Sequence, residues 1–278
     1  MDVRGFFDNI NWDLLMRSVS KHTDCKWVLL YIERWLKTPV IQSNGTMVKR
    51  EKGTPQGAVI SPILANLFLH YTFDRWMRGR HPEILFERYA DDIVCHCRSE
   101  EQARQLRSQL EARFEECQRE LHPEKTKIVY CKDANRKGEY PHTRFDFLGY
   151  TFRPRSAMNR SGERFVSFSP AVSDKAAKRQ RWRIRRWRLH RRNDLALEDI
   201  AKWVRPVLSG WVRYYGRFHR SAICKALRTI DSYLIRWAQR KYKRLRCRYM
   251  RVWEWLRQVK LSRPDLFAHW GSGIAVGQ

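Results

Sequence analysis

Two adjacent acidic residues, Asp91 and Asp92, stand between two short β-rich runs, Leu85 to Ala90 and Ile93 to Cys97. This pattern predicts a β-hairpin with both acids at its tip. Neighbouring carboxylates in a sheet-rich core repel each other, and a divalent cation is a strong reason to keep them together. Mg²⁺ binds one or two carboxylates plus substrate phosphates, so a third acid would complete a site for two ions about 3.5 to 4 Å apart.

Asp2 is the candidate for the third acid. The segment from Val3 to Phe7 is rich in strand-forming residues, and it would begin a split β-α-β unit beside the hairpin of Asp91 and Asp92. A simpler interpretation stays open, in which the acid pair is a turn dipeptide and Asp2 is a solvated terminal residue.

Hydrophobic periodicity predicts the elements that would position these acids. Asn44-Gly45 favours a type I′ turn between two short strands, and Ser99 with Gln102 forms a capping box. The order strand, helix, hairpin, helix, strand predicts an α+β first half with an antiparallel sheet. The expected segments are a strand over 3–7, helical residues 14–36, a hairpin over 40–49, a buried, mostly helical stretch over 63–77, a helix from 99 to 122, a strand over 127–131, and an edge hairpin of 145–152 with 164–168.

The second half is predicted to be a bundle of helices. Helical spacing recurs over 174–191, 195–218, 221–247 and 249–260. Pro206 and Gly210 lie inside the second of these helices, which indicates a kink or a close helix contact.

Charge separates the two halves. The chain has 56 Lys and Arg against 29 Asp and Glu, a net charge of +27. Residues 1–150 account for only +3 of it and residues 151–278 for +24. Such an excess implies a polyanionic partner.

Other features exclude alternatives to a nucleic-acid partner. The longest nearly apolar run, Ala58 to Tyr71, is too short to cross a membrane, and no secretory leader pattern is present, so a cytoplasmic protein is expected.

The seven cysteines lack a C-x-x-C pair and are expected to be reduced. In Cys95-His96-Cys97, strand alternation would put the imidazole opposite both sulfurs, which argues against zinc.

Three motifs occur in one order: Asp2 to Ile10, Gly53 to Pro62, and Tyr89 to Asp92. Together they resemble the palm of reverse transcriptases. The forms D-V-R-G-F-F-D-N-I and G-T-P-Q-G-x-x-x-S-P are most similar to bacterial group II intron-encoded reverse transcriptase/maturases. The resemblance continues through Leu121–Lys127, Phe147–Tyr150, Leu208–Tyr215 and Pro264–Trp270.

The resemblance implies the metal site. Asp2 and Asp91 would be the main ligands of two Mg²⁺ ions, with the Val3 backbone carbonyl assisting and Asp92 in a supporting role. The reaction would be attack of a primer 3′-hydroxyl on the α-phosphate of a deoxynucleoside triphosphate.

The resemblance also implies roles around this centre. Phe7 would block a ribose 2′-hydroxyl, and Gln56 would contact the incoming nucleotide near its sugar. Lys125 would protonate the leaving pyrophosphate. Leu148 and Gly149 would belong to the hairpin that grips the primer. Alternatives stay open: a core Phe, a plain turn around Gln56, and solvated charges for both Lys125 and its neighbour Lys127.

The basic half corresponds to the thumb, called domain X in maturases, which binds template-primer and intron RNA. Cations neutralise phosphates and aromatic faces stack exposed bases, although most of the aromatic residues are expected in the bundle core. The expected partners are group II intron RNA and an RNA template with a DNA primer, with target DNA as a further candidate. The candidate RNA-binding residues are Arg181, Arg183, Arg185, Arg186, Arg188, Arg213, Lys241, Lys243 and Arg244.

The expected domains are a palm over 1–152, a connecting hairpin over 153–172, a thumb over 173–260 and a tail over 261–278. In the family, fingers precede the first metal-binding Asp, so the chain is interpreted as truncated at its N-terminus and lacking an endonuclease domain. A polymerase-inactive remnant that only binds RNA and assists splicing is the main alternative. A retron-type enzyme is disfavoured by Gly210-Trp211.

Overall fold

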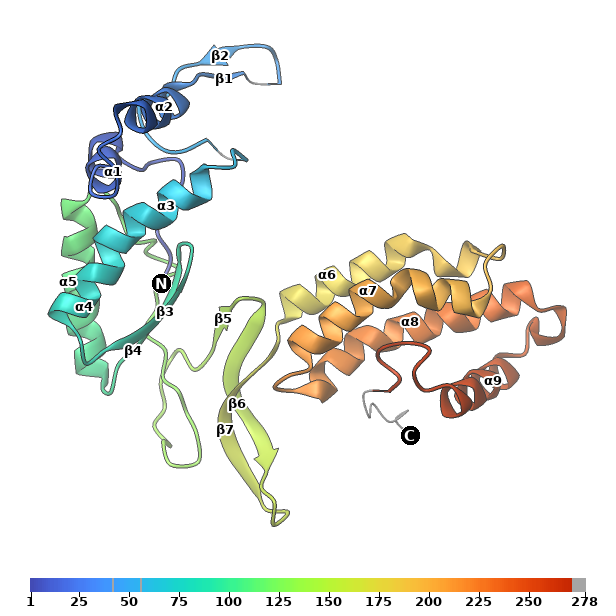
Figure 1. Ribbon diagram of the computed structural model, residues 1–278. Coiled ribbons are helices and arrows are strands. Elements are labelled where there is room, and N and C mark those ends of the chain that lie inside the picture. The colour runs from blue at the N-terminus through green and yellow to red at the C-terminus, as the bar shows by residue number, and fades with distance from the viewer. Residues whose placement is uncertain (42, 56, 272–278) are drawn as a thin grey trace. The chain divides into compact units, whose positions relative to one another are not determined.

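The computed structural model describes residues 1–41, 43–55 and 57–271. The chain forms two compact units, Met1–Ile128 and Val129–Gln278 (Figure 1). Both helices and strands are present, in agreement with an α+β chain. Within the described ranges, no helix combines the length and the apolar character that crossing a membrane requires.

Unit 1, Met1–Ile128, is mainly helical, with two short hairpins. Asn11 caps its first helix by accepting from the Leu14 amide, and Ser99 caps the last by accepting from the Gln102 amide at 3.1 Å. The elements are α1 (Trp12–Val19), α2 (Lys26–Lys37), β1 (Val40–Ile41), β2 (Met47–Val48), α3 (Ser61–Leu69), the π turn His70–Asp74, α4 (Arg75–Arg80), β3 (Leu85–Tyr89), β4 (Asp92–His96) and α5 (Glu100–Glu116).

The first residues of the chain lie between two other segments. The Met1 nitrogen and carbonyl bond to the Ile93 carbonyl and amide at 2.8 and 3.1 Å. On the other side, Val3 forms an isolated antiparallel bridge with Leu121. The predicted strand over 3–7 is wrong beyond this bridge, because the chain turns at Gly5 (φ +48°), where the Asp8 amide bonds to the Gly5 carbonyl.

Aromatic packing joins the β3–β4 hairpin to the helices of unit 1. The Phe73 ring lies 4.9 Å from that of Phe86 on β3 and 6.5 Å from that of Phe114 on α5, measured between centroids. Phe73 and Phe114 are fully buried. The predicted helix over 63–77 is confirmed, with a π turn inside it. The prediction that this stretch is buried is wrong for one side of it, where Ile63 and Asn66 are exposed.

Two predicted segments of unit 1 differ from the structure. Helix α5 ends at Glu116 rather than near His122, because Gln118 adopts a left-handed backbone (φ +56°) and Leu121 pairs with Val3. Residues 127–131 do not form a strand, since the described backbone there shows a single long-range bond, from the Tyr130 amide to the His142 carbonyl.

The hairpin around Asn44-Gly45 is present, but its strand pairing is shifted by one residue from the register that a two-residue turn would give. Val40 pairs with Val48 and Ile41 with Met47, whereas a two-residue turn at Asn44-Gly45 would pair Ile41 with Val48. The Asn44 side chain accepts from the Thr46 amide, a turn bond inside this connection.

Unit 2, Val129–Gln278, has a three-stranded antiparallel sheet in the order β5-β6-β7, followed by helices. The predicted run 145–152 is split at Leu148-Gly149, and the sheet belongs to this unit rather than to the edge of the first half. Residues 129–152 therefore belong to the same compact unit as the helices that follow the sheet. The elements are β5 (Phe145–Phe147), β6 (Tyr150–Met158), β7 (Arg164–Val172), α6 (Asp174–Trp187), a 3₁₀ turn Leu189–Arg191, α7 (Leu197–Tyr215), α8 (Arg220–Lys241), a 3₁₀ turn Lys243–Leu245 and α9 (Tyr249–Ser262).

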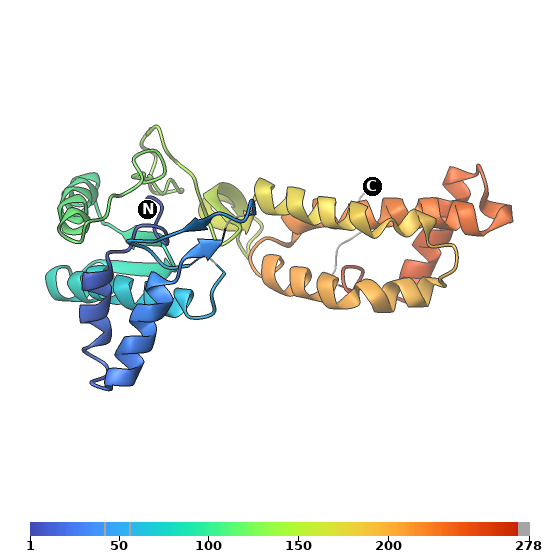
Figure 2. The same cartoon turned by 90° about the horizontal axis from the view of Figure 1, so that it is seen from above.

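Helices α6, α7 and α8 run side by side (Figures 1 and 2) and enclose the core of unit 2 with α9. The predicted bundle is confirmed, although α8 ends at Lys241, earlier than 247. Helix α7 continues through Pro206, and a Cβ on Gly210 would meet no atom within 4 Å, so Gly210 is not a close helix contact.

A mostly buried polar cluster joins the end of unit 2 to α8. The Asp231 carboxylate accepts from Lys260 Nζ at 2.7 Å, from His269 Nε2 at 3.2 Å and from Trp270 Nε1 at 3.1 Å. Burial alone would raise the pKa of Asp231, but His269 and Lys260 outweigh it and lower that pKa. The motif Pro264–Trp270 is thereby fixed to the bundle.

Candidate active site and nucleic-acid interface

The backbone pairing of Met1 with Ile93 brings Asp2 beside the tip of the β3–β4 hairpin. The predicted hairpin is confirmed, but its two-residue turn is Ala90 and Asp91, one residue earlier than predicted. Asp92 is the first residue of β4 and pairs with Tyr89. Ala90 has φ +52°, a left-handed conformation that a non-glycine residue rarely adopts, and it closes this tight turn.

The three carboxylates influence one another. Burial raises the pKa of the Asp91 carboxyl, and the charges of Asp2 and Asp92 raise it further. The Asp91 backbone amide and Lys125 act in the opposite direction. The structure thus places Asp2 and Asp92 near enough to Asp91 for their charges to raise its pKa.

Lys125 reaches this group from the segment after α5. Its Nζ lies 2.7 Å from Asp2 Oδ2, and this contact raises the pKa of Lys125, with further contributions from Asp91 and Asp92. The backbone amide of Thr126 bonds to the His122 carbonyl, and its hydroxyl lies within 3.5 Å of the Asp2 backbone nitrogen. The turn His122–Thr126 therefore presents the lysine to the acids.

The donor set is compatible with Mg²⁺. Carboxylate and carbonyl oxygens are the ligands that this ion prefers. Burial, and after it the charges of Asp2 and Asp92, raise the pKa of Asp91, and a divalent cation would counteract both. Over the described ranges, no three His, Cys, Asp or Glu side chains are grouped closely enough to hold a metal ion. In this structure Lys125 supplies the positive charge beside Asp2.

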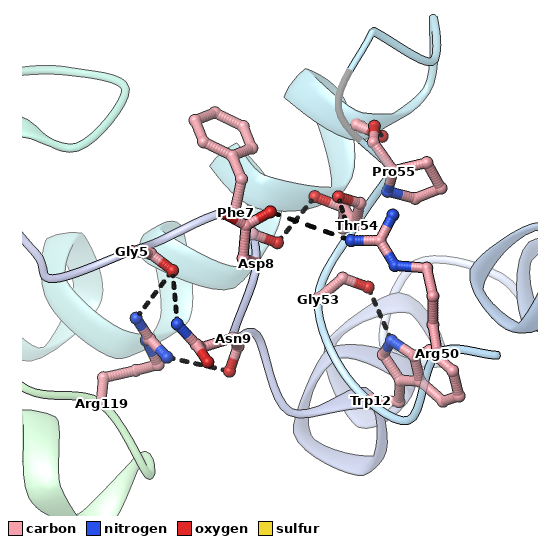
Figure 3. Close-up of polar contacts among 11 residues, drawn as sticks. Gly5, Phe7, Asp8, Asn9, Trp12, Arg50, Gly53, Thr54, Pro55 and Arg119 are labelled. Atoms are coloured by element: carbon pink, nitrogen blue, oxygen red, sulfur yellow. Dashed lines mark hydrogen bonds and ion pairs between the residues drawn. The ribbon is translucent and has the colours of Figure 1, made fainter. Parts of the chain in front are cut away.

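The first two sequence motifs are joined by hydrogen bonds (Figure 3). The Thr54 amide donates to the Phe7 carbonyl at 2.7 Å, and the Gly53 amide to the Ile10 carbonyl at 2.7 Å. The Trp12 indole donates to the Gly53 carbonyl at 2.7 Å. Phe7 is half-buried and packs edge-on against Phe6.

Gly53 is required by this junction. Its φ is +80°, and a Cβ there would lie 2.5 Å from the carbonyl carbon and oxygen of Asp8. Gly57 also has a left-handed backbone (φ +85°), but nothing lies within 4 Å of an added Cβ. Gln56, the predicted nucleotide contact between them, lies outside the described residues.

Sequence reasoning missed two arginines that hold this region (Figure 3). Arg119 is buried, and its guanidinium donates to the carbonyls of Asn9 (2.9 Å), Gly5 (3.3 Å) and Arg4. Arg50 donates to the Thr54 carbonyl at 3.2 Å. The chain has many arginines, and nothing in the sequence around Arg119 or Arg50 distinguishes these two from arginines on the surface.

The predicted primer-grip residues form the turn between β5 and β6. Leu148 (φ +49°) and Gly149 (φ +80°) are both left-handed. The Leu148 carbonyl accepts from the Tyr214 hydroxyl at 2.9 Å, and the Tyr150 hydroxyl donates to the Tyr214 carbonyl. A Cβ on Gly149 would lie 2.8 Å from the Tyr215 hydroxyl. The end of α7 therefore holds this turn, which links two motifs distant in sequence.

The predicted RNA-binding cations differ in availability. Most are exposed, but Arg181 and Lys241 are half-buried. Lys241 donates to the backbone carbonyls of Asn193 at 3.0 Å and Leu195 at 2.6 Å, so it also serves the bundle. The exposed ones are Arg183, Arg185, Arg186, Arg188, Arg213, Lys243 and Arg244.

Comparison with protein families agrees with this geometry. The profile of the reverse transcriptase (RNA-dependent DNA polymerase) family matches residues 1–152, more than half of the chain, so the chain belongs to that family. The profile of the group II intron maturase-specific domain matches residues 177–256. The chain therefore combines a reverse transcriptase region with a region similar to the maturase-specific domain of group II introns.

Individual relatives point the same way. Protein YkfC of Escherichia coli K12 is 29% identical over 209 residues, covering 61% of this chain and 50% of that protein. The group II intron-encoded protein LtrA of Lactococcus lactis subsp. cremoris is 40% identical over 70 residues, 25% of this chain and 11% of LtrA. The putative COX1/OXI3 intron 1 protein of Saccharomyces cerevisiae is 31% identical over 77 residues, 28% of this chain and 9% of that protein. The chain spans half of YkfC and smaller parts of the other two.

Proposed function

We propose that this chain acts as an RNA-directed DNA polymerase and maturase on group II intron RNA, with Asp2 and Asp91 at the centre of nucleotidyl transfer. The observation that carries this proposal is the meeting of Asp2, Asp91 and Lys125, which come from three separate segments of unit 1. Repelling carboxylates beside a lysine have a clear use where metal ions and a triphosphate bind.

Asp2 and Asp91 would hold two Mg²⁺ ions, with the Val3 carbonyl assisting and Asp92 in a supporting role. The bound ions would favour ionisation of the primer 3′-hydroxyl and stabilise charge on the pyrophosphate. The 3′-oxygen bonds to the α-phosphorus, its proton passes to water, and the bond to the bridging oxygen breaks. Lys125 then gives a proton to the departing pyrophosphate, and its position beside Asp2 favours it over Lys127 for this role.

Other residues would select and orient the substrates. Phe7 would exclude a ribose 2′-hydroxyl, and the turn that bears it is fixed by Thr54 and Arg119. Gln56 would contact the nucleotide sugar. In unit 2, Leu148 and Gly149 would grip the primer, and the exposed arginines would neutralise phosphates of the template-primer and of the intron RNA.

Primer extension on an RNA template with Mg²⁺ and deoxynucleotides tests the proposal. Asp91→Asn should abolish synthesis, whereas RNA affinity should change less than about twofold because the cations of unit 2 supply most of the attraction. Asp24→Asn, which neutralises an exposed acid of unit 1 away from the cluster, is the matched control and should extend the primer normally.

Equal synthesis by wild type and Asp91→Asn would reject the site assignment. A wild-type chain that binds RNA with a steep salt dependence but never extends a primer would instead support the alternative function, RNA binding without polymerisation.

A further inference from the structure

Two tryptophans of unit 2 are unusually exposed. Trp237 is fully buried, and Trp187, Trp211, Trp253 and Trp255 pack against the core of the bundle. Trp182 on α6 is 55% exposed and Trp203 on α7 is 44% exposed. Trp203 still contacts Trp187, with ring centroids 6.3 Å apart. Trp182 has no aromatic neighbour within the described ranges, so packing explains its position less well than that of Trp203.

Helix geometry places Trp182 opposite the core. The buried positions of α6 include Gln180 and Ile184, each two residues away, and about 100° of rotation per residue puts both on the far side of the helix from Trp182. Packing within unit 2 therefore does not account for an indole at this position.

Trp182 is held by a cation on its own helix. The Arg186 guanidinium lies 4.6 Å from the centroid of the Trp182 ring, one turn along α6. A guanidinium over an indole is a favourable pair that fixes the ring and covers part of it. More than half of the side chain still faces solvent, so a flat partner can still reach the ring.

The surrounding charge of α6 is not neutralised. The helix Asp174–Trp187 has seven Lys and Arg residues and a single acid, Asp174. Among the ion pairs of the described chain, none includes a cation of this helix. Besides Arg186, four of these cations are exposed within one turn of Trp182: Lys178, Arg179, Arg183 and Arg185.

We propose that Trp182 and Arg186 form a binding site for an unpaired RNA base, with phosphates of the same strand on the neighbouring cations of α6. Bases stack on indoles and on guanidinium planes, whereas bases inside a duplex already stack on each other and cannot reach such a site. This inference rests on the proposed RNA binding of unit 2 and specifies which RNA it prefers: strands with unpaired nucleotides in loops, bulges or ends.

The test compares two RNAs with equal numbers of phosphates, a hairpin with an unpaired loop and a fully paired duplex, at one salt concentration. Affinities of the full chain are measured by fluorescence anisotropy. Trp182→Ala should weaken binding of the hairpin by about tenfold and leave duplex binding within about twofold. Trp182→Phe, which keeps an aromatic face, should retain most of the hairpin affinity. Arg183→Gln, the matched control, should weaken both RNAs alike because it removes one phosphate contact.

A second measurement keeps the test independent of affinity. With 5-iodouracil in the hairpin loop, photo-crosslinking to wild type should map to the peptide that contains Trp182, and circular dichroism should show Trp182→Ala to be folded. An equal effect of Trp182→Ala on both RNAs, or a crosslink confined to other peptides, would overturn the inference while RNA binding stands. Absence of salt-dependent RNA binding by wild type would overturn the proposed function itself.

Discussion

Each unit brings together motifs that are far apart in sequence, but by different means. In unit 1, the first two motifs meet mainly through the backbone, where Gly53 and Thr54 donate to the carbonyls of Ile10 and Phe7. In unit 2, side chains make the link. The Tyr214 hydroxyl donates to the Leu148 carbonyl, and the Asp231 carboxylate accepts from the Trp270 indole of the C-terminal motif. A backbone junction is sensitive to any added atom, whereas a side-chain junction is sensitive to the loss of particular groups.

The largest effect is expected for Gly53→Ala. The new Cβ would lie 2.5 Å from the Asp8 backbone in a conformation with φ +80°, so the junction between the motifs must open. We expect a loss of roughly 4 kcal/mol in the unfolding free energy of unit 1, measured by urea denaturation.

Gly57→Ala is the control for Gly53→Ala, since it has a similar φ of +85° and free space around the added atom. It should lose only about 1 to 2 kcal/mol, the cost of the left-handed backbone. If the two variants were equally stable, the close approach of Asp8 would not matter and the backbone junction would lose its support.

Asp231→Asn should destabilise unit 2 by about 3 kcal/mol at pH 7, because it leaves Lys260 without its mostly buried partner. The variant should also change the pH dependence. The folded pKa of Asp231 is lowered from an ordinary value of 3.8, so its stabilising effect is complete above that value and is lost as the pH falls through the folded pKa.

Thermal unfolding from about pH 5 down to about pH 2 measures the contribution of Asp231, because the loss occurs below 3.8. The melting temperature of wild type should fall more steeply with acid than that of Asp231→Asn, while Asp265→Asn, an exposed acid in the same motif, should follow wild type. Parallel curves for wild type and Asp231→Asn would contradict the role of this side-chain junction.

Arg119→Lys should cost unit 1 about 2 kcal/mol. The substitution keeps the positive charge but loses the planar fork that reaches the carbonyls of Asn9 and Gly5. Urea denaturation measures the loss, and Arg104→Lys, at an exposed pair with Glu100, should stay within about 0.5 kcal/mol of wild type. Equal losses for the two would show that Arg119 acts only as a charge.

Tyr214→Phe should have the smallest effect, about 1 kcal/mol in unit 2, because it removes one hydrogen bond to the Leu148 carbonyl. The Ser173 amide bonds to the neighbouring Gly149 carbonyl, so its hydrogen exchange should become faster. Tyr242→Phe, at the residue that follows α8, is the control. Unchanged exchange at Ser173 would mean that the turn holds its shape without Tyr214.

Sequence patterns predicted the helices of unit 2 and the hairpin of Asp91 and Asp92 because these rest on local periodicity and turn chemistry. They failed for residues 3–7, where Val and Phe content indicated a strand but Gly5 turns the chain. The C-terminal end of α5 depended on one left-handed residue, Gln118, and the register at Ile41 depended on the bonds of its turn. Hydrophobic periodicity encodes neither.

The candidate active site likewise has contacts that the sequence predicted and contacts that it did not. The order of the elements predicted that Asp2 would lie beside the hairpin of Asp91 and Asp92, and the backbone of Met1 does pair with Ile93 of that hairpin. The contacts of Arg119 and Tyr214 could not be predicted, because each connects to carbonyl groups of residues distant in sequence, and any residue can offer a carbonyl.

The position of the first residues between β4 and Leu121 has a consequence for the order in which the chain acquires its structure. The bond from Met1 to Ile93 spans 92 residues, and the contact of Arg4 with Glu120 spans 116. Such distant pairings are slow to form, since a long loop must close before they stabilise anything. We expect residues 1–4 to dock late, only after α5 and the segment behind it have left the ribosome, although they are synthesised before both.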